Sequence, residues 1–273
     1  MMKVDKEKCI GCELCIDDCI VRDIELVNGK ADMKNDACFK CGHCIAICPK
    51  NAVSTDEYNM DEVKNYKKEE FSIDADNLMN FIKFRRSTRK FKDKEVEIEK
   101  LSKIIEAGRF TQTGSNSQNV SYIVVKEGID KLKEMTLERL NVMGQGILSN
   151  LTPEMMPIKK YAEMWIRMYK DFKANPKGRD GLFFNAPAVI IVVSDSQVNG
   201  ALASSNMELM TNALGLGTFF SGFLVRAAQG NKEMMDYLGI EAGKEIVTCM
   251  VIGYPDVKYS RTVPRKDPDI TWK

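Results

Sequence analysis

Eight of the nine cysteines lie within the first 48 residues, in two sets of four that share one spacing. Each set reads C-x2-C-x2-C-x3-C, and Pro49 follows the second set. The first set is Cys9, Cys12, Cys15 and Cys19, and the second set is Cys38, Cys41, Cys44 and Cys48. Three thiolates on one tight loop can bind three corners of an iron–sulfur cubane, and the fourth ligand then has to come from another part of the chain. The pattern therefore predicts two 4Fe-4S clusters and one-electron chemistry.

Clustered cysteines also build disulfide scaffolds and structural zinc sites, and both fit this sequence less well. No signal peptide precedes the motif, and the segment belongs to a much larger chain with a core of its own, so a disulfide framework is disfavoured. Structural zinc sites use two CxxC pairs that are well separated in sequence, whereas here three cysteines crowd onto one loop in each set. Iron–sulfur clusters are the favoured interpretation.

Matching cysteines of the two sets stand 29 residues apart, which indicates an internal duplication. Over residues 1–56 the chain resembles the bacterial two-cluster ferredoxin family. The resemblance implies that the fourth cysteine of each set binds the cluster of the other set. Cluster one would then be held by Cys9, Cys12, Cys15 and Cys48, and cluster two by Cys38, Cys41, Cys44 and Cys19. One departure is that Ile20, not proline, follows Cys19.

Length and composition limit the number and the kind of domains in the rest of the chain. A sequence of 273 residues, 44% hydrophobic and 29% charged, accommodates the cluster domain and one globular domain of ordinary size. No apolar run approaches the roughly 18 residues that span a bilayer, so we expect a cytoplasmic protein without membrane or nucleic-acid partners. Residues 1–60 carry 8 lysines and arginines against 11 aspartates and glutamates. This acidic surface is either simply solvated or docks on a basic partner.

His43 is the only histidine, and it lies between Cys41 and Cys44. Catalytic triads that use histidine, HExxH zinc sites and two-histidine iron sites are therefore excluded, because each needs histidine outside a cluster loop. His43 itself is predicted to be a loop residue near solvent. Tuning of a cluster by a hydrogen bond from this side chain is the alternative.

The remaining sequence predicts a linker and a second domain. Asn28-Gly29 predicts a hairpin turn between the repeats, and the charged residues 57–75 indicate a partly helical linker between domains at 1–56 and 76–273. Apolar periodicity predicts helices at about 76–84, 97–109, 130–143, 154–174, 199–214 and 231–238. Apolar runs predict strands at 120–125, 188–193 and 246–253, with a further apolar stretch at 218–224. Helices and strands are mixed without regular βαβ alternation, so the predicted fold class is α+β.

Three features of the second domain suit a planar ligand that carries an anionic group. Guanidinium groups and a hydroxyl that fall within one helical turn suit a phosphate dianion, and they belong to Arg85, Arg86, Ser87 and Arg89. Two amides, Asn116 and Gln118, lie on a polar loop before a buried strand, and an amide both donates and accepts, as the edge of a flavin ring requires. Gly215, Gly217 and Gly222 allow a ligand to approach the backbone closely.

The order of these and later motifs resembles the nitroreductase family of FMN flavoproteins over about residues 78–268. The motifs are Arg-Arg-Ser-x-Arg-x-Phe from Arg85, Ser-Asn-Ser-Gln from Ser115, Asn-Ala-Pro from Asn185, Gly-Leu-Gly from Gly215, Gly-Tyr-Pro from Gly253 and Pro-Arg-Lys from Pro264. The resemblance implies an FMN whose phosphate and ribityl chain contact Arg85, Arg86, Ser87, Arg89 and Arg265. It also implies that Asn116 and Gln118 meet the ring and that backbone at Ser221 and Gly222 approaches its other edge. A homodimer with the flavin at its interface is carried over as an expectation.

Some parts of this domain are less well defined by the resemblance. The family often has Pro-Trp after the amide loop, whereas Asn119 and Val120 follow here. The helix at 154–174 is predicted to form domain or dimer core, with a lid over the substrate as the alternative. No side chain is an evident general acid, so solvent or a hydroxyl such as that of Tyr161 or Tyr169 would supply protons. Cys249 lies in an apolar run and is expected to be buried.

Together the two modules predict an iron–sulfur flavoprotein oxidoreductase that passes electrons between two 4Fe-4S clusters and FMN. Its acceptor would be a small organic molecule such as a nitroaromatic, a quinone or an enone, and its donor reduced ferredoxin or NAD(P)H. No GxGxxG follows a strand, so a Rossmann nicotinamide site is not predicted, although the family accepts hydride without one. Two alternatives stay open: a redox-sensing or electron-storing protein without turnover, and an NAD(P)H-driven flavin domain that exports electrons through the clusters.

Overall fold

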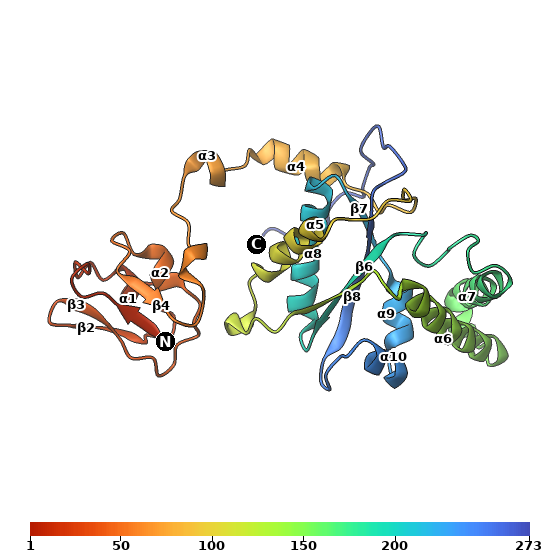
Figure 1. The fold of residues 1–273 in the computed structure, drawn as a ribbon, viewed down its shortest axis with the longest axis horizontal. Helices are drawn as coiled ribbons and strands as arrows, with labels where there is room; N and C mark the ends of the chain where they lie inside the picture. The colour runs from red at the N-terminus through yellow and green to blue at the C-terminus, as the bar shows by residue number, and fades with distance from the viewer. The chain divides into compact units, whose positions relative to one another are not determined.

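The structure, a computed structural model, describes residues 1–273, and its internal contacts divide the chain into two units (Figure 1). Unit 1 contains Met1–Asp74 together with Thr113–Gln118. Unit 2 contains Ala75–Gln112 and Asn119–Lys273. The short segment Thr113–Gln118 therefore folds with unit 1, although the residues on both sides of it belong to unit 2.

Unit 1 is built from two pairs of antiparallel strands and a few short helices. β1 (Met2–Val4) pairs with β4 (Val53–Thr55), and β2 (Ile24–Val27) pairs with β3 (Lys30–Met33). The helices α1 (Leu14–Asp17) and α2 (His43–Ile47) pack against each other. In the charged region that follows, the regular elements are a 3-10 turn, η1 (Met60–Glu62), and a helix, α3 (Lys68–Phe71).

The duplication is visible in the backbone of unit 1. Left-handed residues occur in pairs that stand 29 residues apart, namely Gly11 and Lys40, Glu13 and Gly42, and Arg22 and Asn51. Glycine is required at the first of these positions, because a Cβ on Gly11 would lie 2.2 Å from the carbonyl oxygen of Gly29. Asn28 and Gly29 both have positive φ, and the predicted hairpin turn joins β2 to β3.

Unit 2 is organised around a four-stranded antiparallel sheet in the order β5-β6-β8-β7. Its strands are β5 (Ser121–Val125), β6 (Ala188–Ser194), β8 (Glu245–Gly253) and β7 (Gly217–Phe220). Every residue of β6 is buried, which accounts for its continuous apolar run. A parallel bridge joins Ser87 to Thr218 at the edge of this sheet. Helices surround the sheet, and the predicted α+β class is confirmed.

Helices cover both faces of the sheet (Figure 1). Alternate side chains of β6 point to opposite faces, so they belong to two different cores. Ala188, Ile190 and Val192 belong to the core shared with α5 (Ile98–Arg109) and α8 (Gln197–Ala213). Val189, Ile191 and Val193 belong to the core on the other face. The helices there are α6 (Ile129–Ser149), α7 (Met156–Ala174), α9 (Gly222–Ala228) and α10 (Lys232–Tyr237).

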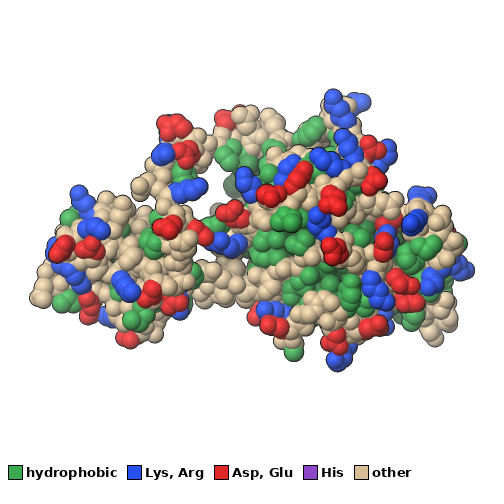
Figure 2. Space-filling model, viewed as in Figure 1, with side chains coloured by type: hydrophobic (Ala, Val, Ile, Leu, Met, Phe, Trp, Pro, Cys, Tyr) green, Lys and Arg blue, Asp and Glu red, His purple; other side chains and the backbone are tan.

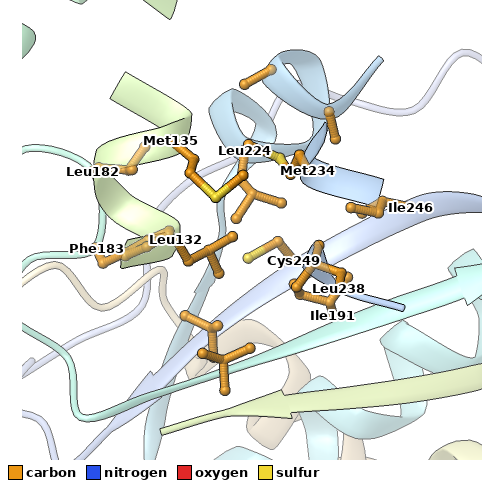
Figure 3. Close-up of a cluster of buried hydrophobic side chains, with 14 of the residues drawn as sticks. Leu132, Met135, Leu182, Phe183, Ile191, Leu224, Met234, Leu238, Ile246 and Cys249 are labelled. Carbon is orange, nitrogen blue, oxygen red and sulfur yellow. The ribbon is translucent and has the colours of Figure 1, made fainter. Parts of the chain in front are cut away.

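Cys249 of β8 lies inside this second layer (Figure 3). Its neighbours in the core include Leu132 from α6 and Leu224 from α9. Complete burial raises the pKa of the Cys249 thiol well above its ordinary value, because the thiolate would lose its hydration. The ninth cysteine is therefore a core side chain, as expected from its apolar surroundings in the sequence.

Two segments differ from their predicted extents. The apolar stretch 218–224 is split, because β7 ends at Phe220 and α9 begins at Gly222. Ser221 forms the turn between them, and its buried N–H donates to the carbonyl oxygen of Cys249 at 2.8 Å. α6 continues to Ser149, since the glycines near its predicted end do not interrupt it.

The helix predicted at 154–174 begins as a 3-10 turn, η3 (Pro153–Met155), and continues as α7. Ala162 and Trp165 of α7 are buried, and Trp165 packs edge-on against Phe223 of α9. The inner face of α7 is thus domain core. By contrast, α4 (Ala75–Phe84) has no buried residue. None of the helices is long and apolar enough to cross a membrane.

Two glycines of α6 provide a test of how closely α6 and α7 pack. A Cβ on Gly144 would lie 2.8 Å from the carbonyl oxygen of Ala162, whereas a Cβ on Gly146 would meet nothing within 4 Å. Gly144→Ala should lower the free energy of unfolding by about 1–3 kcal/mol, because the helices must move apart. Gly146→Ala should raise it by about 0.5–1 kcal/mol through helix propensity. Urea unfolding followed by circular dichroism measures both, and equal effects of the two substitutions would contradict the close approach.

Candidate cluster and flavin sites

Two cavities in unit 1 are lined by cysteines that come from both sequence sets. The first is lined by Cys9, Cys12, Cys15 and Cys48, and the second by Cys19, Cys38, Cys41 and Cys44. Cys15 also reaches the wall of the second cavity. The exchange arises because α1 and α2 pack side by side, and Cys19 and Cys48 follow these helices. The structure therefore brings the fourth cysteine of each set to the cavity that is lined by the first three cysteines of the other set.

The sulfurs do not converge on a single ion. No group of three or more histidine, cysteine, aspartate or glutamate side chains is placed to hold one metal ion. A structural zinc site needs its sulfur ligands at about 2.3 Å from one centre, whereas a cubane binds each thiolate at a separate iron corner. A thiolate-only donor set spread around a cavity thus suits a polynuclear iron–sulfur cluster.

Four of the cysteine sulfurs accept hydrogen bonds from the backbone. The N–H of Asp23 donates to Cys19 at 3.4 Å, and the N–H of Ala52 donates to Cys48 at 3.2 Å, so the two exchanged cysteines have equivalent partners. Further donors are Ala31 to Cys9 at 3.5 Å and Lys40 to Cys38 at 3.4 Å. Such bonds stabilise thiolate charge and help to set the reduction potential of a bound cluster.

The cysteines differ in burial. Cys12 and Cys41 are exposed, whereas Cys9, Cys15 and Cys44 are buried. Burial, reinforced by the neighbouring sulfurs, raises the pKa of the Cys44 thiol to about 11. This thiol therefore becomes a ligand when iron displaces its proton, which couples metal binding to proton release.

His43 lies at the start of α2, with its side chain largely in solvent. Its Nδ1 atom is 3.0 Å from Asp18 Oδ2, next to the end of α1. The histidine thus links the two repeats at the surface of unit 1, and no second histidine or carboxylate joins it to form a metal site.

The predicted phosphate-binding segment of unit 2 lies between β7 and the end of β8. Ser87 pairs with Thr218, and the N–H of Thr88 donates to the Thr218 carbonyl oxygen at 2.9 Å. Four residues further along, Phe91 pairs with Pro255 after β8. The backbone of this segment is therefore held on two sides by the sheet.

Two glycines allow other motifs to lie against this segment. A Cβ on Gly217 would lie 2.4 Å from Thr88 Oγ1. A Cβ on Gly253 would lie 2.8 Å from both the Phe91 ring and Pro187 Cδ. The Arg-Arg-Ser, Asn-Ala-Pro, Gly-Leu-Gly and Gly-Tyr-Pro motifs thus meet at one place in unit 2, although they are far apart in the sequence.

The cationic side chains of the segment have different surroundings. Arg85 Nη1 donates to Glu208 Oε1 of α8 at 2.9 Å, and Glu208 is buried. Arg85 Nε is buried without a partner. Arg86 is partly buried, and the exposed Arg89 has its guanidinium carbon 6.0 Å from the ring centre of Phe219. An unsatisfied donor among several cations fits a ligand that accepts hydrogen bonds, such as a phosphate.

The structure differs from the predicted ligand-binding set at two residues, Glu208 and Arg265. Glu208 was not predicted from the sequence. The one sequence feature that could have indicated a role is that Glu208 is the single charged side chain of α8. Arg265 lies in the exposed segment after β8, which has no helix or strand. It makes no hydrogen bond or ion pair with the other residues predicted to hold the ligand, so its part in the site stays a prediction.

The residues predicted at the ring edge line an open pocket of about 300 Å³ at the junction of β7, α9 and β8. Ser221 and Gly222 lie on its wall together with Arg226 and Thr248. A Cβ on Gly222 would meet nothing within 4 Å, so the backbone there faces free space. This volume is at the lower end of small-molecule pockets, and it leaves room for a planar group beside the backbone.

The two predicted amides lie in the segment that folds with unit 1. Asn116 Nδ2 donates to the carbonyl oxygens of Phe39 and Lys40, at 3.1 and 3.0 Å. Gln118 Nε2 donates to Tyr58 Oη at 2.8 Å. The structure therefore places both amides in unit 1 and not among the unit 2 residues described above. Their contact with a flavin ring stays a prediction.

Comparison with known proteins assigns both units. A model of the nitroreductase family matches residues 82–254, and a model of the 4Fe-4S dicluster domain matches residues 1–49. An FMN-bound nitroreductase from Desulfitobacterium hafniense is 23% identical, with a TM-score of 0.51 over 71% of this chain and 97% of that chain. A BluB-like flavoprotein from Clostridium difficile is 21% identical, with a TM-score of 0.53 over 70% of this chain and 94% of that chain. At these identities the likeness shows the fold.

A short stretch of the chain is also similar to a curated protein. A component of the ion-translocating oxidoreductase complex of Methanosarcina acetivorans is 38% identical over 45 residues, which make up 16% of this chain. The chain spans 17% of the length of that relative. The similarity therefore concerns one small module and not the whole of that protein.

The crossed cysteines make a testable prediction about ligand connectivity. Cys19→Ala should damage the cluster in the second cavity, although Cys19 belongs to the first sequence set, because its sulfur lines that cavity. Cys48→Ala should damage the cluster in the first cavity. Iron analysis and electron paramagnetic resonance of the reduced variants measure which signal is lost. A Cys19→Ala protein that keeps the second signal and loses the first would refute this connectivity.

Proposed function

The chain belongs to the nitroreductase family, and on this basis we propose that it is an iron–sulfur flavoprotein oxidoreductase. Residues 1–56 contain the cluster ligands of the two-cluster module, residues 57–75 form a linker, and residues 76–273 form the FMN module apart from Thr113–Gln118, which fold with the cluster module. Electrons pass between the clusters and FMN, and the acceptor is a small organic molecule such as a nitroaromatic, a quinone or an enone. The donor is reduced ferredoxin, with NAD(P)H as the other candidate.

The observation that supports this proposal most is that one chain contains two cysteine-lined cavities and a fold in which distant motifs meet beside a cationic segment. Solved proteins of similar fold contain FMN. In this chain Arg85, Arg86, Ser87 and Arg89 fit the phosphate, since a buried guanidinium N–H there lacks a partner. Ser221 and Gly222 fit the ring, since they line an open pocket.

When bound, the clusters carry single electrons and FMN passes between one- and two-electron chemistry, which no side chain can supply. The residues of the chain bind and orient these groups. The arginines neutralise the phosphate, and the buried Glu208 carboxylate fixes the direction of Arg85. In turnover each donor molecule loses one electron, and two such transfers with two protons from solvent reduce a quinone or an enone double bond.

A second copy of the chain is the partner that unit 2 fits best. α4 has no buried residue, and its exposed apolar side chains are Leu78, Met79, Ile82 and Phe84. The segment after β8 exposes Val257, Tyr259, Val263, Ile270 and Trp272. Hydrophobic side chains also gather on the visible face of unit 2 (Figure 2). Burial of such surface against a symmetric copy is favourable, so we propose a homodimer.

Arg85→Ala tests the phosphate site. Loss of a charge-assisted hydrogen bond of about 1.5–3 kcal/mol should weaken FMN binding about 10- to 100-fold. Quenching of flavin fluorescence during titration of the apoprotein gives the dissociation constant. Because Arg85→Ala leaves the Glu208 carboxylate buried without its partner, the double variant Arg85→Ala/Glu208→Gln serves as a control for stability. Wild-type FMN affinity in both variants would remove Arg85 from the site.

Flavin reduction by different donors tests the overall function. In anaerobic stopped-flow measurements we expect reduced ferredoxin to bleach the flavin rapidly when both clusters are present. A Cys12→Ser/Cys41→Ser variant changes one exposed ligand in each cavity. Its flavin should still be reduced by dithionite, but much more slowly by ferredoxin.

Three results would change this assignment. Equal ferredoxin rates in the two proteins would contradict electron input through the clusters. Rapid flavin reduction by NADH or NADPH, followed by cluster reduction, would favour export of electrons. A reduced protein that consumes no acceptor at steady state would favour a sensing or storage role.

A further inference from the structure

One peptide group in the second cluster loop is hydrogen-bonded on both of its sides. It joins Phe39 to Lys40, and so carries the carbonyl of Phe39 and the N–H of Lys40. Its N–H donates to Cys38 Sγ at 3.4 Å, and its carbonyl oxygen accepts from Asn116 Nδ2 at 3.1 Å. The same nitrogen of Asn116 donates to the next carbonyl along the chain, at 3.0 Å. A continuous series of hydrogen bonds therefore links Asn116 to a sulfur of the second cavity.

The first repeat lacks this arrangement. Gly11 stands 29 residues before Lys40 and is also left-handed. No side chain donates to the preceding carbonyl, that of Ile10. Lys40, with a φ of 53°, adopts a conformation that is unfavourable for a residue with a Cβ. The hydrogen bonds from Asn116 help to hold that conformation.

The segment that carries Asn116 is itself held in unit 1 by further contacts. Gln118 Nε2 donates to Tyr58 Oη at 2.8 Å, and the Gln118 N–H donates to Thr113 Oγ1 at 2.9 Å. Lys40 Nζ pairs with Glu57 at 2.9 Å, which fixes the other side of the cluster loop. The segment that carries Asn116 is thus anchored in unit 1 through more than one residue.

We propose that Asn116 is a positioning residue for the second cluster, which it orients and tunes through the peptide group between Phe39 and Lys40. Hydrogen bonds in series polarise one another, so donation to the Phe39 carbonyl makes the Lys40 N–H a stronger donor to Cys38. A stronger donor to a ligand sulfur stabilises the reduced, more negative cluster and raises its potential. The inference rests on the proposed function in that it requires a cluster in this cavity.

Asn116 comes from a segment whose two ends are joined by peptide bonds to unit 2. The residues that flank it are fixed there, because Asn206 Nδ2 donates to Thr111 Oγ1 at 2.7 Å and Asn199 Nδ2 donates to Asn119 Oδ1 at 2.9 Å. Asn116 therefore reaches the cluster loop from a segment that lies 76 residues further along the chain and folds with unit 1.

An anaerobic redox titration of the full-length protein, followed by electron paramagnetic resonance, tests this role. Asn116→Ala should lower the midpoint potential of the second cluster, through about a two- to tenfold change in its equilibrium constant for reduction. The first cluster should be unchanged. Asn116→Asp has the same size, but its carboxylate cannot donate and adds a negative charge near the cluster, so it should lower the potential further. Asn59→Ala is the control, because Asn59 is another side-chain amide of unit 1 that accepts from the Asp61 N–H and lines neither cavity, and it should leave both potentials unchanged.

Iron, sulfide and FMN contents of each variant separate the ways in which the inference could fail. A wild-type protein without clusters would overturn the proposed function itself. Cluster potentials that do not change in Asn116→Ala, or that change equally in Asn116→Ala and Asn59→Ala, would overturn the role of Asn116 and leave the proposed function intact. If Asn116→Ala loses iron, selective loss of the second signal supports the positioning role, and loss of both signals contradicts it.

Discussion

Unit 1 depends on its thiolates more than on its apolar side chains. Its core consists of Met2, Ile24, Ala31, Ala52 and Val53 together with the cysteines Cys9, Cys15 and Cys44. A domain of this size buries little apolar surface, and metal binding then contributes directly to the free energy of folding. Because Cys19 and Cys48 cross between the repeats, each bound cluster would join both halves of the unit. The clusters are thus the framework of unit 1 as well as its electron carriers.

Unit 2 has an ordinary apolar core, and it places its cationic segment by a different means. Backbone hydrogen bonds hold that segment, with Thr88 bonded to Thr218 and the N–H of Lys92 bonded to the carbonyl oxygen of Tyr254 at 2.8 Å. Gly217 and Gly253 leave the space that the segment occupies. The position of the backbone that carries the arginines therefore depends on the sheet edge, and it does not rely on the conformational preferences of an exposed loop.

Much of this organisation was predictable from local patterns, and the rest depends on long-range contacts. Cysteine spacing and the buried run at 188–193 carry their meaning within a few residues, so the clusters and the central strand could be predicted. The break at Ser221 could not, because residues on both sides are apolar and one hydrogen bond to Cys249 separates strand from helix. The partners of Asn116 and Arg85 lie 77 and 123 residues away in the sequence, and no local pattern encodes contacts of that range.

The discontinuous course of unit 1 has a consequence for its biosynthesis. All eight cluster cysteines have been synthesised by residue 48, but Thr113–Gln118, which completes the unit, leaves the ribosome only after α4 and α5. Modules tend to fold in the order in which they are made, so iron–sulfur assembly on the nascent chain can precede the arrival of Asn116. Unit 1 also cannot be separated whole by one cut in the linker, because Thr113–Gln118 would stay in the C-terminal fragment.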